Sequence, residues 1–173
     1  MLPAVIADAC YGVLMRDGRE ALASADAGEI SPAFERVVEA VVLMSGLAFE
    51  NGGLSLAHSM TRGLMALKGA GQHLHGFHVA YGALVQLVHE QDGSTYRDLR
   101  AYLRSIGLPT SLGDLGVTVS GRTIDALVGA TVAAPHMRNC VPVPTADSLT
   151  RAIQSVEADA GATCGYLHGL GEL

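Results

Sequence analysis

Apolar positions recur at helical spacing along almost the whole chain, and clusters of glycine and proline separate the resulting segments. Few stretches alternate in the way that a half-buried strand would require. The pattern therefore predicts an all-α fold, a bundle of about six or seven helices. The predicted helices are Pro3–Arg16, Pro32–Phe49, Leu54–Leu67, His75–Gln91, Ser94–Ile106, Ser120–Ala134 and Thr145–Leu167.

Two of these helices have clear start signals. Ser31 is a good N-cap residue followed by a proline at the first helical position, and Thr145 is a second cap with Asp147 in the next turn. The helix that follows Ser31 is apolar around most of its circumference, which predicts burial on several sides and a place at the centre of the bundle. Its apolar residues are Val37, Val38, Val41, Val42, Leu43, Met44, Leu47 and Phe49.

Length and composition bound the class of protein. A chain of 173 residues is the size of one domain, so we expect a single helical domain over residues 1–173. Hydrophobic residues make up 49% and charged residues 16%, which leaves more apolar surface than a small monomer needs to hide and predicts a homo-oligomer. The net charge of −6, with no basic stripe in the sequence, argues against a nucleic-acid or anionic-membrane partner.

Cysteine usage and hydropathy indicate the compartment. Cys10, Cys140 and Cys164 are an odd number without metal-type spacing, which is typical of reduced thiols in a cytoplasmic protein. The N-terminal apolar run stops at Asp8, without the basic start of a signal peptide. Because Ala40–Phe49 is too short to span a bilayer, we expect a soluble protein with no membrane partner.

The most informative motif has two parts, Phe49-Glu50-Asn51-Gly52-Gly53-Leu54 leading to His58, and His75-Gly76-Phe77-His78-Val79-Ala80-Tyr81-Gly82. It resembles the metal-binding core of glycerol dehydrogenase, a branch of the iron-type alcohol dehydrogenases in the dehydroquinate-synthase-like superfamily. That family has Phe-Glu-Ser-Gly-Gly-Leu before one ligand histidine and His-Gly-Glu-Lys-Val-Ala-Phe-Gly at the second. The resemblance runs weakly from about Ala7 to about Asp159.

This resemblance implies that His58 and His75 hold a catalytic Zn²⁺ or Fe²⁺ that polarises a small polyol for hydride transfer to NAD. It also implies that Gly52, Gly53 and Gly76 let the backbone approach a ligand closely. From the residues alone, each histidine is more often a satisfied helix-end or core side chain than a metal ligand.

The remaining histidines and one acidic residue have simpler interpretations. His73, His75 and His78 form an HxHx₂H run, but residues two apart do not face each other, and only His75 matches a ligand of the family. His89 and His168 stand near helix C-termini, where a positive charge is favourable. Glu50 is expected to cap or pair, and His136 matches a His-Asn segment of the family only loosely.

The chain departs from the family pattern at several positions. Thr61 and Arg62 replace a histidine and an asparagine, and Phe77-His78 replaces a Glu-Lys pair. The third metal ligand of the family, an aspartate, has no counterpart, because Asp8 lies only fifty residues before His58. The Gly-rich nucleotide-binding half is absent too, so NAD would bind only through a separate domain or subunit.

Two functional hypotheses follow from this comparison. In the first, the chain is the metal- and substrate-binding half of an NAD-dependent polyol oxidoreductase and works with a separate nucleotide-binding partner. In the second, it is a catalytically degenerate domain that serves as an oligomeric or binding module. A dehydroquinate-synthase-like lyase is a weaker third hypothesis, since Arg62 alone does not make a phosphate-binding helix.

Overall fold

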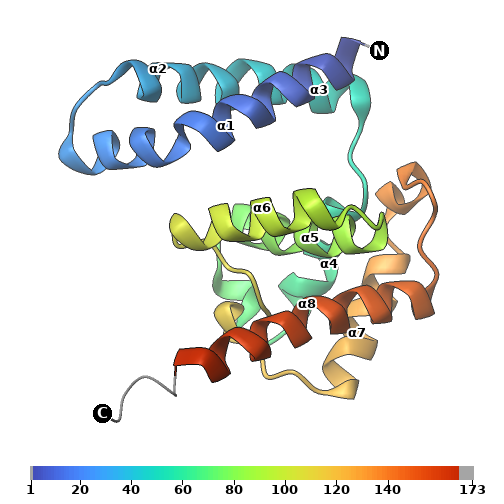
Figure 1. Cartoon of the computed structure of the whole chain (residues 1–173). Coiled ribbons are helices and arrows are strands. Elements are labelled where there is room, and N and C mark those ends of the chain that lie inside the picture. The colour runs from blue at the N-terminus through green and yellow to red at the C-terminus, as the bar shows by residue number, and fades with distance from the viewer. Residues whose placement is uncertain (1, 168–173) are drawn as a thin grey trace, which may run out of the picture. The chain divides into compact units, whose positions relative to one another are not determined.

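The computed structural model describes residues 2–167, with side chains up to residue 161, and all regular structure in this range is helical (Figure 1). The α-helices are α1 (Leu2–Ala27), α2 (Pro32–Glu39), α3 (Ser45–Gly52), α4 (Leu56–Ala66), α5 (His75–His89), α6 (Gly93–Ser105), α7 (Gly121–Val132) and α8 (Ala146–Leu167). A π-helical turn, η1 (Ala40–Met44), joins α2 to α3, and short 3₁₀ turns are η2 (Ala70–Gln72), η3 (Gly113–Leu115) and η4 (Pro135–Asn139). Because α2, η1 and α3 are continuous, the described residues form seven helices, and the all-α prediction is confirmed.

Side-chain caps fix several helix starts. The Ser31 hydroxyl accepts a hydrogen bond from the Phe34 amide at 3.2 Å, as the sequence predicts. The Thr145 hydroxyl likewise accepts from the Ser148 amide at 3.1 Å, so this cap is also confirmed. Capping therefore explains why these helices begin where the sequence places them.

The first helix is longer than predicted. It passes through Asp17 and Gly18 and ends at Ala27, before Gly28 with a φ of 68°. Asp17 is buried at 5% exposure and forms ion pairs with Arg16 at 2.7 Å and with Arg36 of α2 at 2.8 Å. These contacts outweigh the cost of a glycine inside a helix, roughly 1 kcal/mol, which the sequence pattern alone could not show.

The described residues group into two compact units, a hairpin of residues 2–54 and a larger unit of residues 55–167. The single-domain organisation stays a prediction. In the hairpin, α1 packs along the continuous helix from Pro32 to Gly52. The buried apolar side chains of the hairpin are all small: Cys10, Ala21, Ala33 and Ala40. The Cys10 thiol donates to the Ala40 carbonyl at 3.4 Å, where the π turn begins.

The helix that follows Ser31 was predicted to be buried on several sides, and within the hairpin that prediction is wrong. Val41, Val42 and Leu43 are 54%, 74% and 53% exposed. The main packing partner of this helix is α1, which covers a single face. An apolar pattern around a whole helix shows that the helix needs cover, but it does not identify the covering element.

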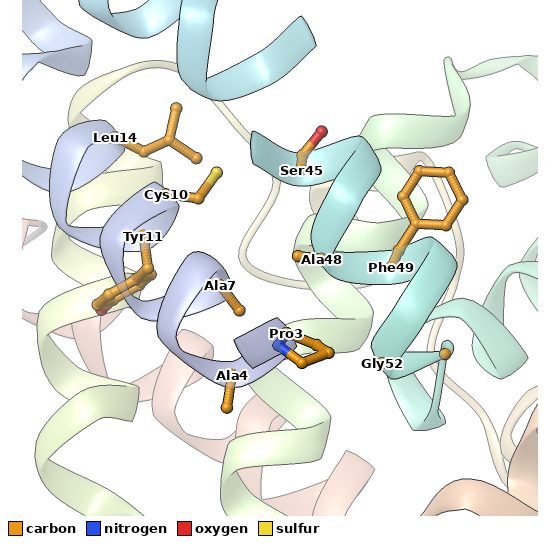
Figure 2. A pocket seen from close by; sticks show the side chains of 11 residues that line it. Pro3, Ala4, Ala7, Cys10, Tyr11, Leu14, Ser45, Ala48, Phe49 and Gly52 are labelled. Atoms are coloured by element: carbon orange, nitrogen blue, oxygen red, sulfur yellow. The ribbon is translucent and has the colours of Figure 1, made fainter. Parts of the chain in front are cut away.

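An apolar groove of about 530 Å³ lies between α1 and α3 within the hairpin. Figure 2 shows Ala7 and Cys10 of α1 pointing towards α3, with Ala48 on the opposite wall. The groove exists because small side chains line both walls. It contains little that could orient a polar substrate.

The larger unit has a conventional core. Helix α4 packs against α5, α7 and η4, and α5 packs in turn against α6 and α8. The fully buried side chains are large and come from every one of these α-helices except α6: Leu56, Met60, Leu64, Tyr81, Leu84, Leu127, Leu149 and Ile153. The candidate functional residues are therefore carried by the best-packed part of the described chain.

Candidate metal centre

The two histidines predicted as metal ligands lie next to each other. His58 is in the first turn of α4, and His75 is the first residue of α5. Their ring centroids are 5.6 Å apart, with the ring planes tilted by 48°. His58 is half-buried and His75 is exposed, so the pair is open to solvent on one side. The fold thus brings together two side chains that are seventeen positions apart in the sequence.

Burial and nearby charge act on His58. Burial is the largest cause that lowers the pKa of His58, followed by the positive charges of His75 and His136. A lowered pKa keeps the imidazole neutral to a lower pH, and the neutral ring is the form that offers a nitrogen lone pair to a metal.

A glycine sets the distance between the two helices that carry this pair. A Cβ atom on Gly82 of α5 would lie 2.5 Å from the Ala57 carbonyl oxygen of α4, so only glycine allows the two backbones to approach this closely. Gly76 has open space around it, and Gly52 would make only ordinary contact with Pro3. The close approach seen among the described residues is therefore between the two helices, at Gly82. The close approach of a ligand to Gly52, Gly53 and Gly76 stays a prediction.

A side chain from α5 also caps the start of α4. The Gln86 amide oxygen accepts hydrogen bonds from the Ser55 hydroxyl and the Ala57 amide, both at 3.0 Å. This satisfies one of the free amides in the first turn of α4, one residue before His58. Sequence analysis missed Gln86, because nothing in a sequence shows that a residue 29 positions later will cap a helix. Gly82 had a usable signal, as a glycine inside an apolar helix.

The other histidines have structural roles or lie apart from the pair. His78 is buried, and its Nε2 donates to the Ala70 carbonyl at 2.8 Å. The His73 ring packs on Phe77, with centroids 5.6 Å apart. His89 bonds the Pro142 carbonyl at 3.0 Å, and His168 lies outside the described residues. The simpler interpretations of His73 and His78 fit these contacts.

His136 lies closer to the pair than its loose sequence match indicated. It belongs to η4, which packs against α4, and its charge acts on His58. The substituted Thr61 takes a local role, since its hydroxyl donates to the His58 carbonyl at 2.7 Å. Glu50 is an exposed residue of α3.

The separation of the two imidazoles can be compared with the separation that a shared metal ion requires. Two imidazoles on one tetrahedral ion, with metal–nitrogen distances of about 2.0–2.1 Å, place their ring centroids roughly 5–6 Å apart. The separation between His58 and His75 falls in this range. No group of three or more His, Cys, Asp or Glu side chains in the described part of the chain is arranged to hold a metal ion. The residues present therefore fit two positions of a metal's coordination shell.

The described helices were also compared with the requirements for crossing a membrane. No single helix among them is long and apolar enough, and only the bent pair Pro32–Gly52 and Leu56–Ala66 passes by length and composition.

Comparison with known proteins gives a consistent result. A glycerol dehydrogenase of Escherichia coli O6:H1 is 38% identical over 113 residues, which are 65% of this chain and 31% of that protein. The structure of a probable glycerol dehydrogenase from Sinorhizobium meliloti 1021 superposes with a TM-score of 0.87 at 33% identity, over 93% of this chain and 46% of that one. The structure of glycerol dehydrogenase from Schizosaccharomyces pombe gives 0.83 at 35% identity, over 91% and 41%. No protein-family model matches the chain.

These likenesses show first that the chain is similar in sequence and in its helical fold to part of a dehydrogenase. More specifically, it is homologous to the C-terminal helical part of glycerol dehydrogenases. It spans about a third of the length of the curated relative and less than half of the two solved structures. The resemblance that the motif around His58 and His75 indicates is thereby confirmed.

Proposed function

We propose that this chain is the metal- and substrate-binding half of a glycerol-dehydrogenase-like, NAD-dependent polyol oxidoreductase, with His58 and His75 as ligands of Zn²⁺ or Fe²⁺. The observation that carries the proposal is the 5.6 Å pairing of the two rings, in a chain homologous to glycerol dehydrogenases. Such an ion, when bound, supplies Lewis-acid polarisation of an alcohol oxygen.

The protein residues contribute position and protonation state. Gly82 and Gln86 fix α4 against α5, so the two imidazoles are held before any ligand arrives. Burial lowers the pKa of His58 and so favours its neutral form, while the exposed His75 leaves an open side for a small polyol. In this proposal a nucleotide-binding domain, on another polypeptide or in a longer parent chain, provides NAD and the remaining metal ligand.

The second candidate function is a catalytically degenerate module that assembles with copies of itself. The exposed apolar side chains of the hairpin favour it, because patches of this kind mark interaction surfaces. They include Val38, Val41, Val42, Leu43, Leu47 and Phe49. The two candidates are separated by metal binding, which only the first requires.

Zinc titration tests the first candidate. We expect the purified chain to bind Zn²⁺ weakly, because two imidazoles leave the charge of the ion without a carboxylate. His58→Ala and His75→Ala should each weaken the affinity at least about tenfold, since each removes one of two ligands. Calorimetric titration of the wild-type chain and the two variants measures this.

Two histidine variants serve as matched controls. His73→Ala and His89→Ala should leave the zinc affinity within about twofold, because neither ring belongs to the pair. Unchanged affinity in both His58→Ala and His75→Ala would contradict the ligand assignment. The chain alone should show no NAD-dependent glycerol oxidation, and turnover by the pure chain would overturn the half-enzyme proposal.

Self-association tests the surface that favours the second candidate, and both candidates predict it. We expect a concentration-dependent oligomer by sedimentation, and Val42→Asp should shift it towards monomer, because a charge there would have to be buried without a partner. Val141→Asp makes the same change at a site that is 86% exposed on the larger unit, and should leave the sedimentation unchanged. A wild-type monomer at micromolar concentration would exclude the assembly.

A further inference from the structure

Helix α6 gathers three arginines around a pocket that is separate from the paired histidines. Arg97, Arg100 and Arg104 are three and four residues apart, so they share one face of the helix. With Tyr96 and Asp159 they line a pocket of about 320 Å³ in the larger unit. The chain has a net charge of −6, yet among the described residues that line this pocket three guanidinium groups accompany one carboxylate.

Arg100 is the least satisfied of the three. Its side chain is only 12% exposed, and its charged contact is Nη1 to Asp159 at 3.7 Å, a long ion pair. Its Nε and Nη2 atoms are buried and form no hydrogen bond with any residue that the structure describes. Buried charged groups are normally hydrogen-bonded, so we expect the Nε and Nη2 atoms of Arg100 to have an acceptor when the pocket is occupied.

The neighbouring carboxylates are already engaged. The Asp159 Oδ2 atom accepts from the Tyr96 hydroxyl at 2.9 Å, and the Asp159 side chain is half exposed. Burial, followed by this hydrogen bond, raises the pKa of Tyr96 to about 12, so the hydroxyl remains a donor to Asp159. Glu157, the next carboxylate on α8, accepts at Oε1 from the Tyr81 hydroxyl at 2.9 Å and from the Leu112 amide at 3.0 Å.

The other two arginines extend the basic surface outwards. Arg97 is exposed and makes no ion pair with the described residues, and Arg104 is exposed while its Nε donates to the Thr110 hydroxyl at 3.3 Å. Arginine presents its donors in a planar fork that matches two oxygens of a carboxylate or phosphate group. A small anion bound by Arg97 and Arg104 would enter the pocket that Arg100 also lines. The Nε and Nη2 atoms of Arg100 are buried, so its side chain would have to turn to bond the anion through them.

We propose that this pocket binds a small anion through a carboxylate or phosphate group, with Arg97, Arg100 and Arg104 as its recognition residues. The site is independent of the proposed polyol function, because a polyol carries no charge for three guanidinium groups to recognise. The binding should weaken as salt concentration rises, since exposed charges form part of the site.

Calorimetric titration with inorganic phosphate and, separately, with citrate tests the proposal and distinguishes the two anion chemistries. We expect at least one of the two to bind the full chain. Arg97→Gln combined with Arg104→Gln should lower that affinity at least tenfold, because it removes two of the three guanidinium groups, and circular dichroism would show that the variant folds without the Arg104–Thr110 hydrogen bond. Arg100→Gln should lower it equally, and circular dichroism would show that this partly buried variant is folded.

Arg122→Gln, combined with Arg151→Gln, is the matched control: it removes the same charge from exposed positions on α7 and α8 and should leave the affinity within twofold. An equal loss in this control would mean general charge attraction and would overturn the site. The proposal would also be overturned if neither anion binds at a concentration tenfold above a millimolar dissociation constant. Deleting residues 168–173 should change the affinity less than twofold. A tenfold gain would mean that carboxylates of the chain itself compete for the pocket, and it would overturn the assignment of the pocket to a separate small anion.

Discussion

The hairpin of residues 2–54 and the unit of residues 55–167 are both helical, but they bury different kinds of side chain. The hairpin buries alanines, a cysteine and one paired aspartate, while its valines and leucines remain largely exposed. The larger unit buries leucines, a methionine, an isoleucine and a tyrosine completely. Since hydrophobic stabilisation scales with the apolar area removed from water, most of it resides in the larger unit.

The two units differ in what their helix pairs do: one holds side chains in a fixed arrangement, and the other leaves apolar surface exposed. In the larger unit, close packing at Gly82 and the cap from Gln86 hold His58 and His75 in a defined arrangement. In the hairpin, small side chains let α1 approach its neighbour, and the large apolar residues are left for contact with something else. Rigidity supports a binding site, whereas uncovered apolar area supports assembly.

Truncating one large apolar residue in each unit should give the largest contrast. Leu84 is fully buried, so Leu84→Ala should cost about 2–5 kcal/mol of unfolding free energy through lost transfer energy and a cavity. Val42 is 74% exposed, so Val42→Ala should change it by less than about 0.5 kcal/mol at concentrations where the chain is monomeric. Urea denaturation followed by circular dichroism measures both, and similar costs would remove the contrast.

Adding one methyl group at Gly82 tests whether close packing holds the helices of the larger unit. Gly82→Ala places a Cβ atom 2.5 Å from the Ala57 carbonyl and should cost about 1–3 kcal/mol, because backbone must move. Gly129→Ala, in α7 with open space around it, is the matched control and should stabilise by roughly 0.5–1 kcal/mol through helix propensity. Thermal unfolding of the two variants gives the sign, and a stabilised Gly82→Ala would show that the helices are not held by this contact.

The helical fold could be predicted from the sequence because its signals are local. Periodicity located all seven helices, and Ser31 and Thr145 marked starts that the structure confirms. The end of α1 was not predictable, since Asp17 is held inside the helix by Arg36, nineteen positions away. The predicted burial of the helix that follows Ser31 was wrong for a similar reason, because periodicity does not say which surface covers a helix.

The candidate site was predictable only in part. The motif around His58 and His75 indicated the pair, and the structure brings the two rings together. The contributions of Gln86 and His136 depend on contacts across the fold, which spacing does not encode. The three arginines of α6 escaped notice because they are interleaved with other residues, so no basic run appears in the sequence.

The smallest predicted effect concerns the charged contact that joins the two arms of the hairpin. Hydrogen bonds from Arg36, and then from Arg16, hold the pKa of Asp17 well below its usual range. The folded hairpin therefore favours the ionised carboxylate, and this contribution is complete above the ordinary carboxyl pKa of about 4 and is lost as the pH falls below it. Because both arginines are largely exposed, solvent screens the contact and the effect should be modest.

Asp17→Asn removes this contribution without changing the shape of the side chain. At pH 7, the amides of residues 2–54 should exchange with solvent faster in the variant than in the wild-type chain, while those of residues 55–167 should not change. At pH 3 the difference between the two proteins should shrink, because the wild-type carboxylate then begins to lose its advantage. Asp26→Asn makes the same charge change at an exposed position of α1 and should exchange like wild type. Faster exchange in both units of Asp17→Asn would mean that hairpin and core unfold together, and the contrast between them would fail.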